Sequence, residues 1–200
     1  MSVAKNVKSQ VLRYEKGRPF NMRHFFSMGS RRAVDCAMAR LVEEGTVTRV
    51  SRGVYMRPKS SRFVKSVAPE LREVVKAVAE RTGERIAMSG AEAAQRLKLT
   101  TQVPVAPMFY TSGSSRELTI NNQRVKLKHV ADRKLELAGT PAGMVLAALW
   151  YLGKEGVNQQ VLATIANKLS PEVLAEVQAA NIPEWMSKAI ATYQAIPVAA

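Results

Sequence analysis

Eight residues in the first third of the chain have side chains that bind phosphate groups or the edges of DNA bases. A guanidinium group can bond bidentately to a phosphate or to the O6 and N7 atoms of guanine. A serine hydroxyl can donate a hydrogen bond to a phosphate oxygen. Each arginine taken alone is equally consistent with a solvated surface charge, but the cluster favours binding to DNA. The candidate DNA-binding residues are Ser30, Arg31, Arg32, Arg40, Arg49, Arg52, Arg57 and Arg62.

The positive charge of the chain is concentrated in the same region. The 200 residues include 30 Lys and Arg and 16 Asp and Glu, a formal net charge of +14. Residues 1–65 hold fifteen of the basic and four of the acidic residues, which gives +11 there and leaves +3 for residues 66–200. This imbalance predicts a polyanion-binding module joined to a globular segment of nearly balanced charge. The alternative is a merely basic, soluble surface.

Three predicted helices position Arg31 and Arg32. Apolar residues at helical spacing predict a first helix over residues 3–15, and a short second helix precedes Ser30. Ser30 is a good N-cap residue for the third helix, which ends at Gly45. With its apolar stripe turned inward, the arginines of the third helix lie on or near the solvent face. The predicted stripe consists of Val34, Met38, Leu41 and Val42.

A predicted hairpin follows the third helix. Residues 46–50 alternate in the manner of a strand, residues 51–53 can turn, and residues 54–57 form the returning strand. Three helices and a hairpin in this order are typical of a winged helix-turn-helix, in which the third helix enters the major groove of DNA. We therefore expect Arg31 and Arg32 at base edges or nearby phosphates, and the hairpin arginines at the DNA backbone.

The remainder of the chain predicts a second domain. A polar, turn-prone linker over residues 57–62 precedes helices over residues 69–83 and 91–99, with a short strand between them. Three strands and a series of helices follow, and the helices begin near residue 141. The fold class is α+β, with a winged helix-turn-helix domain over residues 1–62. A mixed α/β domain over residues 63–200 has a small antiparallel sheet and a helical C-terminal end.

One predicted strand of the second domain has a basic face of its own. In residues 123–128, Arg124, Lys126 and Lys128 lie on one face, and Val125 and Leu127 lie on the other. The basic face could extend a DNA footprint or bind an acidic or RNA partner. The alternative is the solvated face of a half-buried strand, which is more common.

The sequence contains no recognisable catalytic or cofactor motif. It has two histidines, no GxSxG elbow and no GxxxxGK[ST] phosphate loop. Asp132 and Glu136 are interspersed with basic residues and are interpreted as surface charge, and neither His24 nor Cys36 has a partner at metal-ligand spacing. We therefore expect no enzyme activity, no cofactor and no metal.

Cysteine usage and hydropathy bear on the compartment. A single cysteine excludes an intramolecular disulfide and favours a reducing cytoplasm. No window approaches the roughly 18 consecutive apolar residues of a membrane span. The N-terminus has no apolar stretch like the core of a signal peptide. We expect a cytoplasmic protein that does not associate with a membrane.

Two segments resemble a known family. Residues 17–58, with the GSRRAVDCAMARLVEEG helix and the RVSRGVYMRP hairpin, resemble the N-terminal domain of AbiEi-type antitoxins. Residues 89–104, SGAEAAQRLKLTTQVP, resemble the second signature of that family. These antitoxins belong to type IV toxin-antitoxin, or abortive infection, systems. Together the matches span most of residues 10–130, and the helical C-terminal end is less distinctive.

The resemblance implies a transcriptional autorepressor that binds inverted repeats in its own promoter. It also implies an antitoxin that counters a nucleotidyltransferase-like toxin, commonly without forming a stable complex with it. Two alternatives remain open: a stand-alone winged-helix regulator with a ligand-sensing or dimerising C-terminal domain, and a DNA-acting enzyme that uses the hairpin for targeting. A toxin gene beside this one would favour the antitoxin over the stand-alone regulator.

Overall fold

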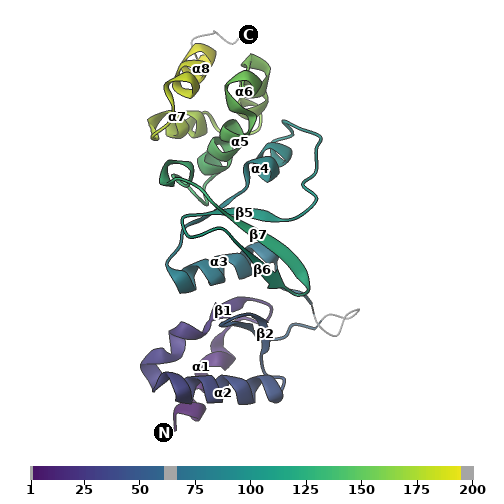
Figure 1. Cartoon of the computed structure of the whole chain (residues 1–200), viewed down its shortest axis with the longest axis vertical. Helices are drawn as coiled ribbons and strands as arrows, with labels where there is room; N and C mark the ends of the chain where they lie inside the picture. The colour runs from purple at the N-terminus through teal and green to yellow at the C-terminus, as the bar shows by residue number, and fades with distance from the viewer. Residues whose placement is uncertain (1, 61–66, 195–200) are drawn as a thin grey trace. The chain divides into compact units, whose positions relative to one another are not determined.

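The computed structural model describes residues 2–60 and 67–194 of the chain (Figure 1). It is an α+β protein with two small sheets, which confirms the α+β class predicted from the sequence. The chain folds into two compact units. Unit 1 comprises Met1–Glu84 and Leu118–Arg124, and unit 2 comprises Arg85–Glu117 and Val125–Ala200.

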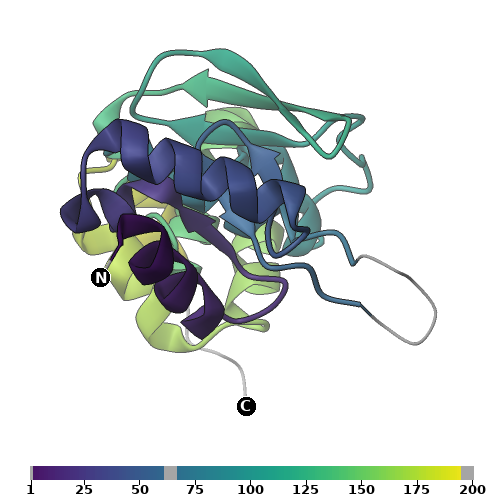
Figure 2. The ribbon, with the colours of Figure 1, turned by 90° about the horizontal axis from the view of Figure 1, so that it is seen from below.

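Unit 1 begins with three helical segments at the predicted places. They are α1 (Val3–Arg13), the 3-10 helix η1 (Met22–Met28) and α2 (Arg31–Glu43). The Ser30 hydroxyl accepts a hydrogen bond from the backbone N–H of Ala33, which confirms Ser30 as the N-cap of α2. Figure 2 looks onto α1 and α2, which pack against each other. The apolar core beneath the helices includes Val7, Val11, Phe20, Phe25, Val34, Met38, Leu41 and Val47.

A three-stranded antiparallel sheet completes the core of unit 1. Its strands are β1 (Pro19–Asn21), β2 (Thr48–Ser51) and β3 (Val54–Met56), in the order β1-β3-β2. The β2–β3 hairpin agrees with the sequence prediction, but β1 was not predicted. Three residues are too few to show an alternating pattern, and β1 is stabilised by pairing with β3 far along the chain, where Phe20 lies opposite Tyr55.

A further helix, α3 (Leu71–Thr82), also belongs to unit 1. It packs on β1 and on the β2–β3 hairpin, and Val74, Val75 and Val78 on its apolar face are buried. The domain boundary that we predicted between residues 62 and 63 lies outside the described residues. The two compact units divide between Glu84 and Arg85, after α3 has ended at Gly83.

The second sheet has four strands in the order β4-β5-β7-β6. They are β4 (Ile86–Met88), β5 (Met108–Thr111), β6 (Arg116–Ile120) and β7 (Gln123–His129). The predicted turn between β6 and β7 is confirmed, because Asn121 and Asn122 have the positive φ angles, 48° and 65°, that such a hairpin turn requires.

The antiparallel sheet that we predicted is instead a mixed sheet. β4 and β5 are antiparallel, but β5 and β7 are parallel. The hairpin places β7 rather than β6 beside β5, and β7 contributes two buried apolar residues to the sheet. Val125 and Leu127 are buried, and Leu127 lies opposite the buried Phe109 of β5.

Helices form most of unit 2, as the sequence predicted for its C-terminal end. They are α4 (Gly90–Arg96), the 3-10 helix η2 (Asp132–Lys134), α5 (Pro141–Gly156), α6 (Gln159–Ala166), α7 (Pro171–Ala179) and α8 (Glu184–Gln194). α5 is the most buried of them and contacts α4 and α7. Large side chains of this core include Leu146, Leu149, Leu162, Ile165, Met186 and Ile190.

Gly143 offers a test of the packing around α5. Replacing a helical glycine by alanine ordinarily stabilises a helix by about 1 kcal/mol. At Gly143, however, an added Cβ would lie only 1.9 Å from the backbone carbonyl oxygen of Leu137. We expect Gly143→Ala to lower the free energy of unfolding by about 1 to 3 kcal/mol, as overpacking does. Urea unfolding followed by circular dichroism measures it, and a stabilised variant would contradict this close approach.

Candidate nucleic-acid interface

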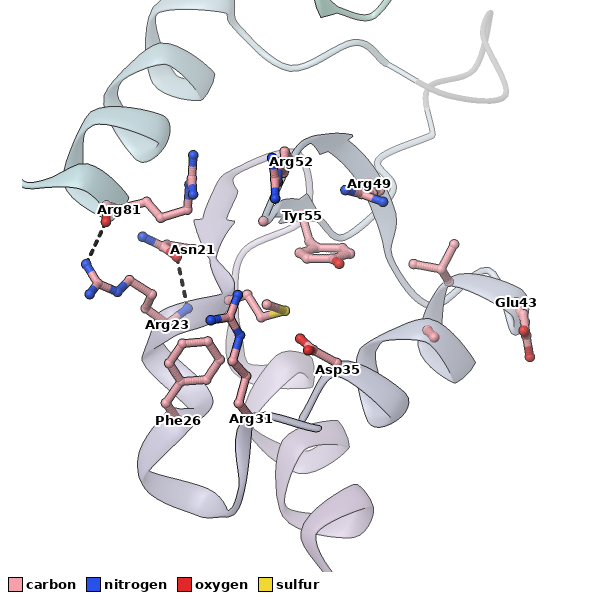
Figure 3. Close-up of a pocket in the computed structure, with 14 residues that line it drawn as sticks. Asn21, Arg23, Phe26, Arg31, Asp35, Glu43, Arg49, Arg52, Tyr55 and Arg81 are labelled. Atoms are coloured by element: carbon pink, nitrogen blue, oxygen red, sulfur yellow. Dashed lines mark hydrogen bonds between the residues drawn. The ribbon is translucent and has the colours of Figure 1, made fainter. Parts of the chain in front are cut away.

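A groove of about 700 Å³ lies between α2 and the β2–β3 hairpin in unit 1 (Figure 3). α2, η1, the hairpin and α3 all contribute side chains to its lining. Figure 3 shows Arg49 and Arg52 on the hairpin side and Arg31 and Asp35 on the α2 side, with Tyr55 between them. The arginines that line the groove are Arg23, Arg31, Arg49, Arg52 and Arg81.

Three predicted DNA-binding residues, Arg31, Arg32 and Arg40, lie at different positions around the outward face of α2. A helix turns by about 100° per residue, and the buried residues Val34, Ala37, Met38 and Leu41 define its inward face. Arg32 then lies near the middle of the outward face, close to Cys36, which is exposed. Arg31 lies at the margin that borders the groove, and Arg40 lies at the opposite margin. The structure therefore places Arg31, but not Arg40, in the groove.

One member of the predicted apolar stripe of α2 is not buried. Val42 is 37% exposed and lines the groove. Its helical position is close to that of Arg31, because eleven residues complete about three turns of a helix. The buried stripe is therefore narrower than we predicted, and the outward face is correspondingly wider.

The hairpin holds its arginines beside the groove through its pairing. Arg49 of β2 lies opposite Tyr55 of β3, and directly paired residues of antiparallel strands project from the same face. The register shifts between Arg49 and Ser51. Gly53 completes the turn after Arg52 with a φ of 72°, a conformation that glycine adopts at little cost. Both Arg49 and Arg52 are exposed and line the groove, as the sequence predicted for a basic hairpin.

Two arginines of the groove were not predicted from the sequence. Arg23 lies in η1, and Arg81 lies in the last turn of α3. The Nη1 group of Arg23 donates a hydrogen bond to the backbone carbonyl oxygen of Arg81 at 2.6 Å. An alanine Cβ at Gly53 would lie 3.1 Å from Cδ of Arg81, so the aliphatic part of Arg81 rests on the hairpin turn. Only the packing of α3 on the sheet brings these residues together, and nothing local in the sequence indicates it.

The lining of the groove has an excess of positive charge. Its carboxylates are Asp35 and Glu43, against five arginines. Within the described residues, none of the five guanidinium groups forms an ion pair with a carboxylate. A concave surface with an excess of one sign of charge concentrates the electric field and attracts counter-ions. The charge of the groove therefore has the sign that attracts a phosphate-bearing polymer or another polyanion.

Arg57 has a different environment from the other hairpin arginines. Its Nη1 atom donates hydrogen bonds to the backbone carbonyl oxygens of Leu12 and Tyr14, at 2.7 and 2.8 Å, at the C-terminal end of α1. It does not line the groove. Arg62, the remaining predicted residue, lies outside the described residues.

An ion pair that does not line the groove joins the middle of α1 to the C-terminal end of α2. The Nζ atom of Lys8 lies 2.7 Å from Oε2 of Glu44. The hydrogen bond and the charge of Lys8 lower the pKa of the Glu44 carboxyl below its ordinary value. Nearby, Tyr14 contacts Nδ1 of His24 through its hydroxyl at 2.9 Å, and burial raises the pKa of Tyr14. His24 is therefore part of an aromatic contact in the scaffold.

The basic face of β7 has the alternation that we predicted. Arg124, Lys126 and Lys128 are exposed, whereas the two apolar residues between them are buried. The Nζ atom of Lys126 lies 3.8 Å from Oε1 of Glu117 on the neighbouring strand, so part of this charge is paired.

The carboxylates considered for metal-dependent chemistry have other partners. Oδ1 of Asp132 forms an ion pair with Nη2 of Arg85 at 2.6 Å, and Glu136 accepts a hydrogen bond from the backbone N–H of Asn181. In residues 2–60 and 67–194, no three His, Cys, Asp or Glu side chains are grouped so that they could hold a metal ion. No helix in the same residues is long and apolar enough to cross a membrane.

Comparison with known proteins finds one family. The model of a family described as a family of unknown function, DUF6088, matches residues 4–177, which include parts of both units. No curated protein matches the chain.

The environment of Arg57 leads to a prediction that separates structural from binding arginines. Hydrogen bonds to a charged group each contribute about 1.5 to 3 kcal/mol. We expect Arg57→Ala to destabilise unit 1 by about 2 kcal/mol in urea unfolding, with Arg57→Lys intermediate because lysine lacks the planar fork. Below the unfolding transition, Arg57→Ala should bind DNA like the unmodified protein. Unchanged stability with weakened DNA binding would instead assign Arg57 to the interface.

Proposed function

We propose that this chain, which belongs to the DUF6088 family of unknown function, is a DNA-binding transcriptional repressor. Residues 3–56 form its winged helix. The convergence of Arg31 from α2 with Arg49 and Arg52 from the β2–β3 hairpin on one groove is the observation that carries the proposal. Solvated surface charges that served only solubility would not need to converge from separate elements.

The topology of unit 1 supports a winged helix. Its elements follow the order α1, β1, η1, α2, β2, β3, and β3 lies between β1 and β2 in the sheet. In this arrangement α2 is the recognition helix and the β2–β3 hairpin is the wing. The N-terminal end of α2, capped by Ser30, then enters the major groove, where its first residues are nearest the base edges.

The arginines divide between two tasks in the proposed complex. Arg32 lies near the middle of the outward face of α2 and reaches base edges, where an arginine can bond bidentately to guanine. Arg31, Arg49 and Arg52 line the groove and bind backbone phosphates, which position the protein without reading the sequence. Arg40 lies at the far margin of α2 and contacts the backbone from the other side.

The biological role that we propose is that of an antitoxin which represses its own promoter. The support is the resemblance of residues 17–58 and 89–104 to AbiEi-type antitoxins, and the repressor function does not depend on it. The partners would be double-stranded DNA with inverted repeats and a nucleotidyltransferase-like toxin. Co-expression of this chain with a neighbouring toxin gene tests this role, because an antitoxin should restore the growth that the toxin inhibits. A chain that represses its promoter but does not restore growth would be the stand-alone regulator. A reducing cytoplasm suits both roles and the exposed Cys36.

Arginine substitutions test the division between reading and positioning. We expect Arg32→Ala to cost about 1 to 3 kcal/mol of binding to DNA from upstream of the gene and to relax the preference at one base pair. Arg52→Ala should weaken binding to all duplexes alike and reduce the slope of log affinity against log salt concentration by about one unit. Fluorescence anisotropy over a salt series measures both. Wild-type affinity in Arg32→Ala would remove α2 as the recognition helix.

The single cysteine provides a second, independent test. Cys36 is exposed on the outward face of α2, and the sequence contains no other thiol. Attaching a bulky maleimide there should abolish DNA binding, because a helix in the major groove, about 12 Å wide, leaves no room for the adduct. DNA should in turn slow the labelling of Cys36. The Cys36→Ser variant, treated identically, is the control, and a labelled protein that binds normally would contradict the proposed orientation of α2.

A further inference from the structure

We propose that Arg23 and Arg81 hold one backbone phosphate of DNA in the groove, although neither belongs to the recognition helix or the wing. This inference rests on the proposed function and assigns a further phosphate site within it. It also makes α3, which follows the winged helix in the chain, a working part of the DNA-binding unit.

The geometry of DNA requires a phosphate backbone at this place. The major and minor grooves of a duplex are separated by a sugar-phosphate strand. If α2 lies in the major groove and the hairpin turn reaches the adjacent minor groove, one strand must pass between α2 and the hairpin. That space is the arginine-lined groove, and Arg23 and Arg81 line it together with Arg52.

The side chain of Arg81 is held in place, but one of its donor atoms lacks a hydrogen-bond partner. Its aliphatic part packs on Gly53 at the hairpin turn. Its Nε atom is buried and has no hydrogen-bond partner within the described structure. A buried donor without an acceptor costs free energy, and the negative charge of an oxyanion bound at the other nitrogens of the same guanidinium would offset part of that cost.

Arg23 is fixed beside Arg81 by two hydrogen bonds. Its Nη1 group donates to the backbone carbonyl oxygen of Arg81, and its backbone N–H donates to Oδ1 of Asn21, which is buried. Figure 3 draws both bonds and shows Arg23 next to the end of α3. Both side chains line the groove, and each positive charge attracts a phosphate group that passes through it. Each arginine is therefore tethered at the groove before a phosphate group binds.

A phosphate can reach this site from DNA or from a free phosphorylated ligand. The groove favours the polymer, because its five arginines come from η1, α2, the hairpin and α3, and a single small phosphate cannot contact all of them at once. A DNA strand can place one phosphate at the arginines while the rest of the duplex gains its binding energy elsewhere.

The experiment combines single-phosphate changes with arginine variants of the full chain. The probe is an upstream duplex in which one phosphate at a time is replaced by an uncharged methylphosphonate. We expect the unmodified protein to lose about ten-fold in affinity at the phosphate that passes between α2 and the hairpin. Arg23→Gln and Arg81→Gln should each lower the affinity for unmodified DNA by about ten-fold and reduce the slope of log affinity against log salt concentration. Neutralising that phosphate should lower the affinity of these variants little further.

Arg13→Gln is the matched control, because Arg13 is an exposed arginine of α1 that does not line the groove. It should bind every duplex like the unmodified protein. If circular dichroism shows that Arg81→Gln does not fold, Arg81→Lys replaces it. This variant keeps the positive charge, so it should bind DNA more weakly while the dependence of its affinity on salt concentration stays unchanged.

The outcomes separate this inference from the proposed function. The phosphate site would be overturned, with DNA binding left intact, if both glutamine variants bound with wild-type affinity. It would also be overturned if the affinity lost through the arginine substitution and the affinity lost through the methylphosphonate added at every phosphate position. A protein that binds no duplex would remove the proposed function and this inference with it. Titration with inorganic phosphate and with AMP forms the last arm. Tight binding of either that displaces DNA and depends on Arg23 and Arg81 would assign the site to a free ligand and overturn the DNA contact.

Discussion

The arginines of unit 1 repel one another, and the other interactions of that unit must offset this cost in folding free energy. Five guanidinium groups line one groove, and within the described residues none of them is neutralised by an ion pair. Two unit charges about 4 Å apart repel by about 1 kcal/mol in water and by more where the surroundings are less polar. The unit offsets this repulsion with apolar burial, since each large side chain contributes about 1.5 to 3 kcal/mol when fully buried. Phe25, Val34 and Met38, directly beneath the helices, are fully buried.

Arginine also serves as a structural tie in this unit. Arg57 donates to carbonyl oxygens at the end of α1, and Arg23 donates to a carbonyl oxygen at the end of α3. The C-terminal end of a helix has unpaired carbonyl groups and a partial negative charge, which a cation stabilises. Arg57 is thereby held away from the groove, whereas Arg23 is held in it. The residue type alone could not distinguish these two uses.

Signals that act within a few residues could be read from the sequence. Ser30 caps α2, Gly45 has the positive φ of a helix stop, and Asn121 and Asn122 form the predicted turn. These positions depend on backbone conformation, which the residue type largely determines.

Features that depend on distant partners could not be predicted in this way. β1 exists because of its pairing with β3, and the parallel neighbour of β5 is β7 rather than β6. The groove itself was only half predicted. The arginines of α2 and the hairpin were expected to share a surface, but Arg81 joins them through the packing of α3 on the sheet. An amphipathic helix reveals which face is buried, but not which surface receives it.

The short side chains on α2 determine how the proposed repressor would discriminate between DNA sequences. Cys36 and Ala39 lie on the outward face and allow the helix to approach the bases closely, but neither can make the bidentate contacts that identify a base pair. Arg32 is then the main reader, and a mismatched base pair changes the free energy of binding by about 1 to 3 kcal/mol. Specific sites are typically bound about 4 to 10 kcal/mol more tightly than random DNA. One copy of such a helix falls short of that range, whereas two copies on an inverted repeat double the discrimination. In the proposed complex, operator recognition would therefore depend on a repeated site, since the phosphate contacts of the groove would add affinity for every sequence alike.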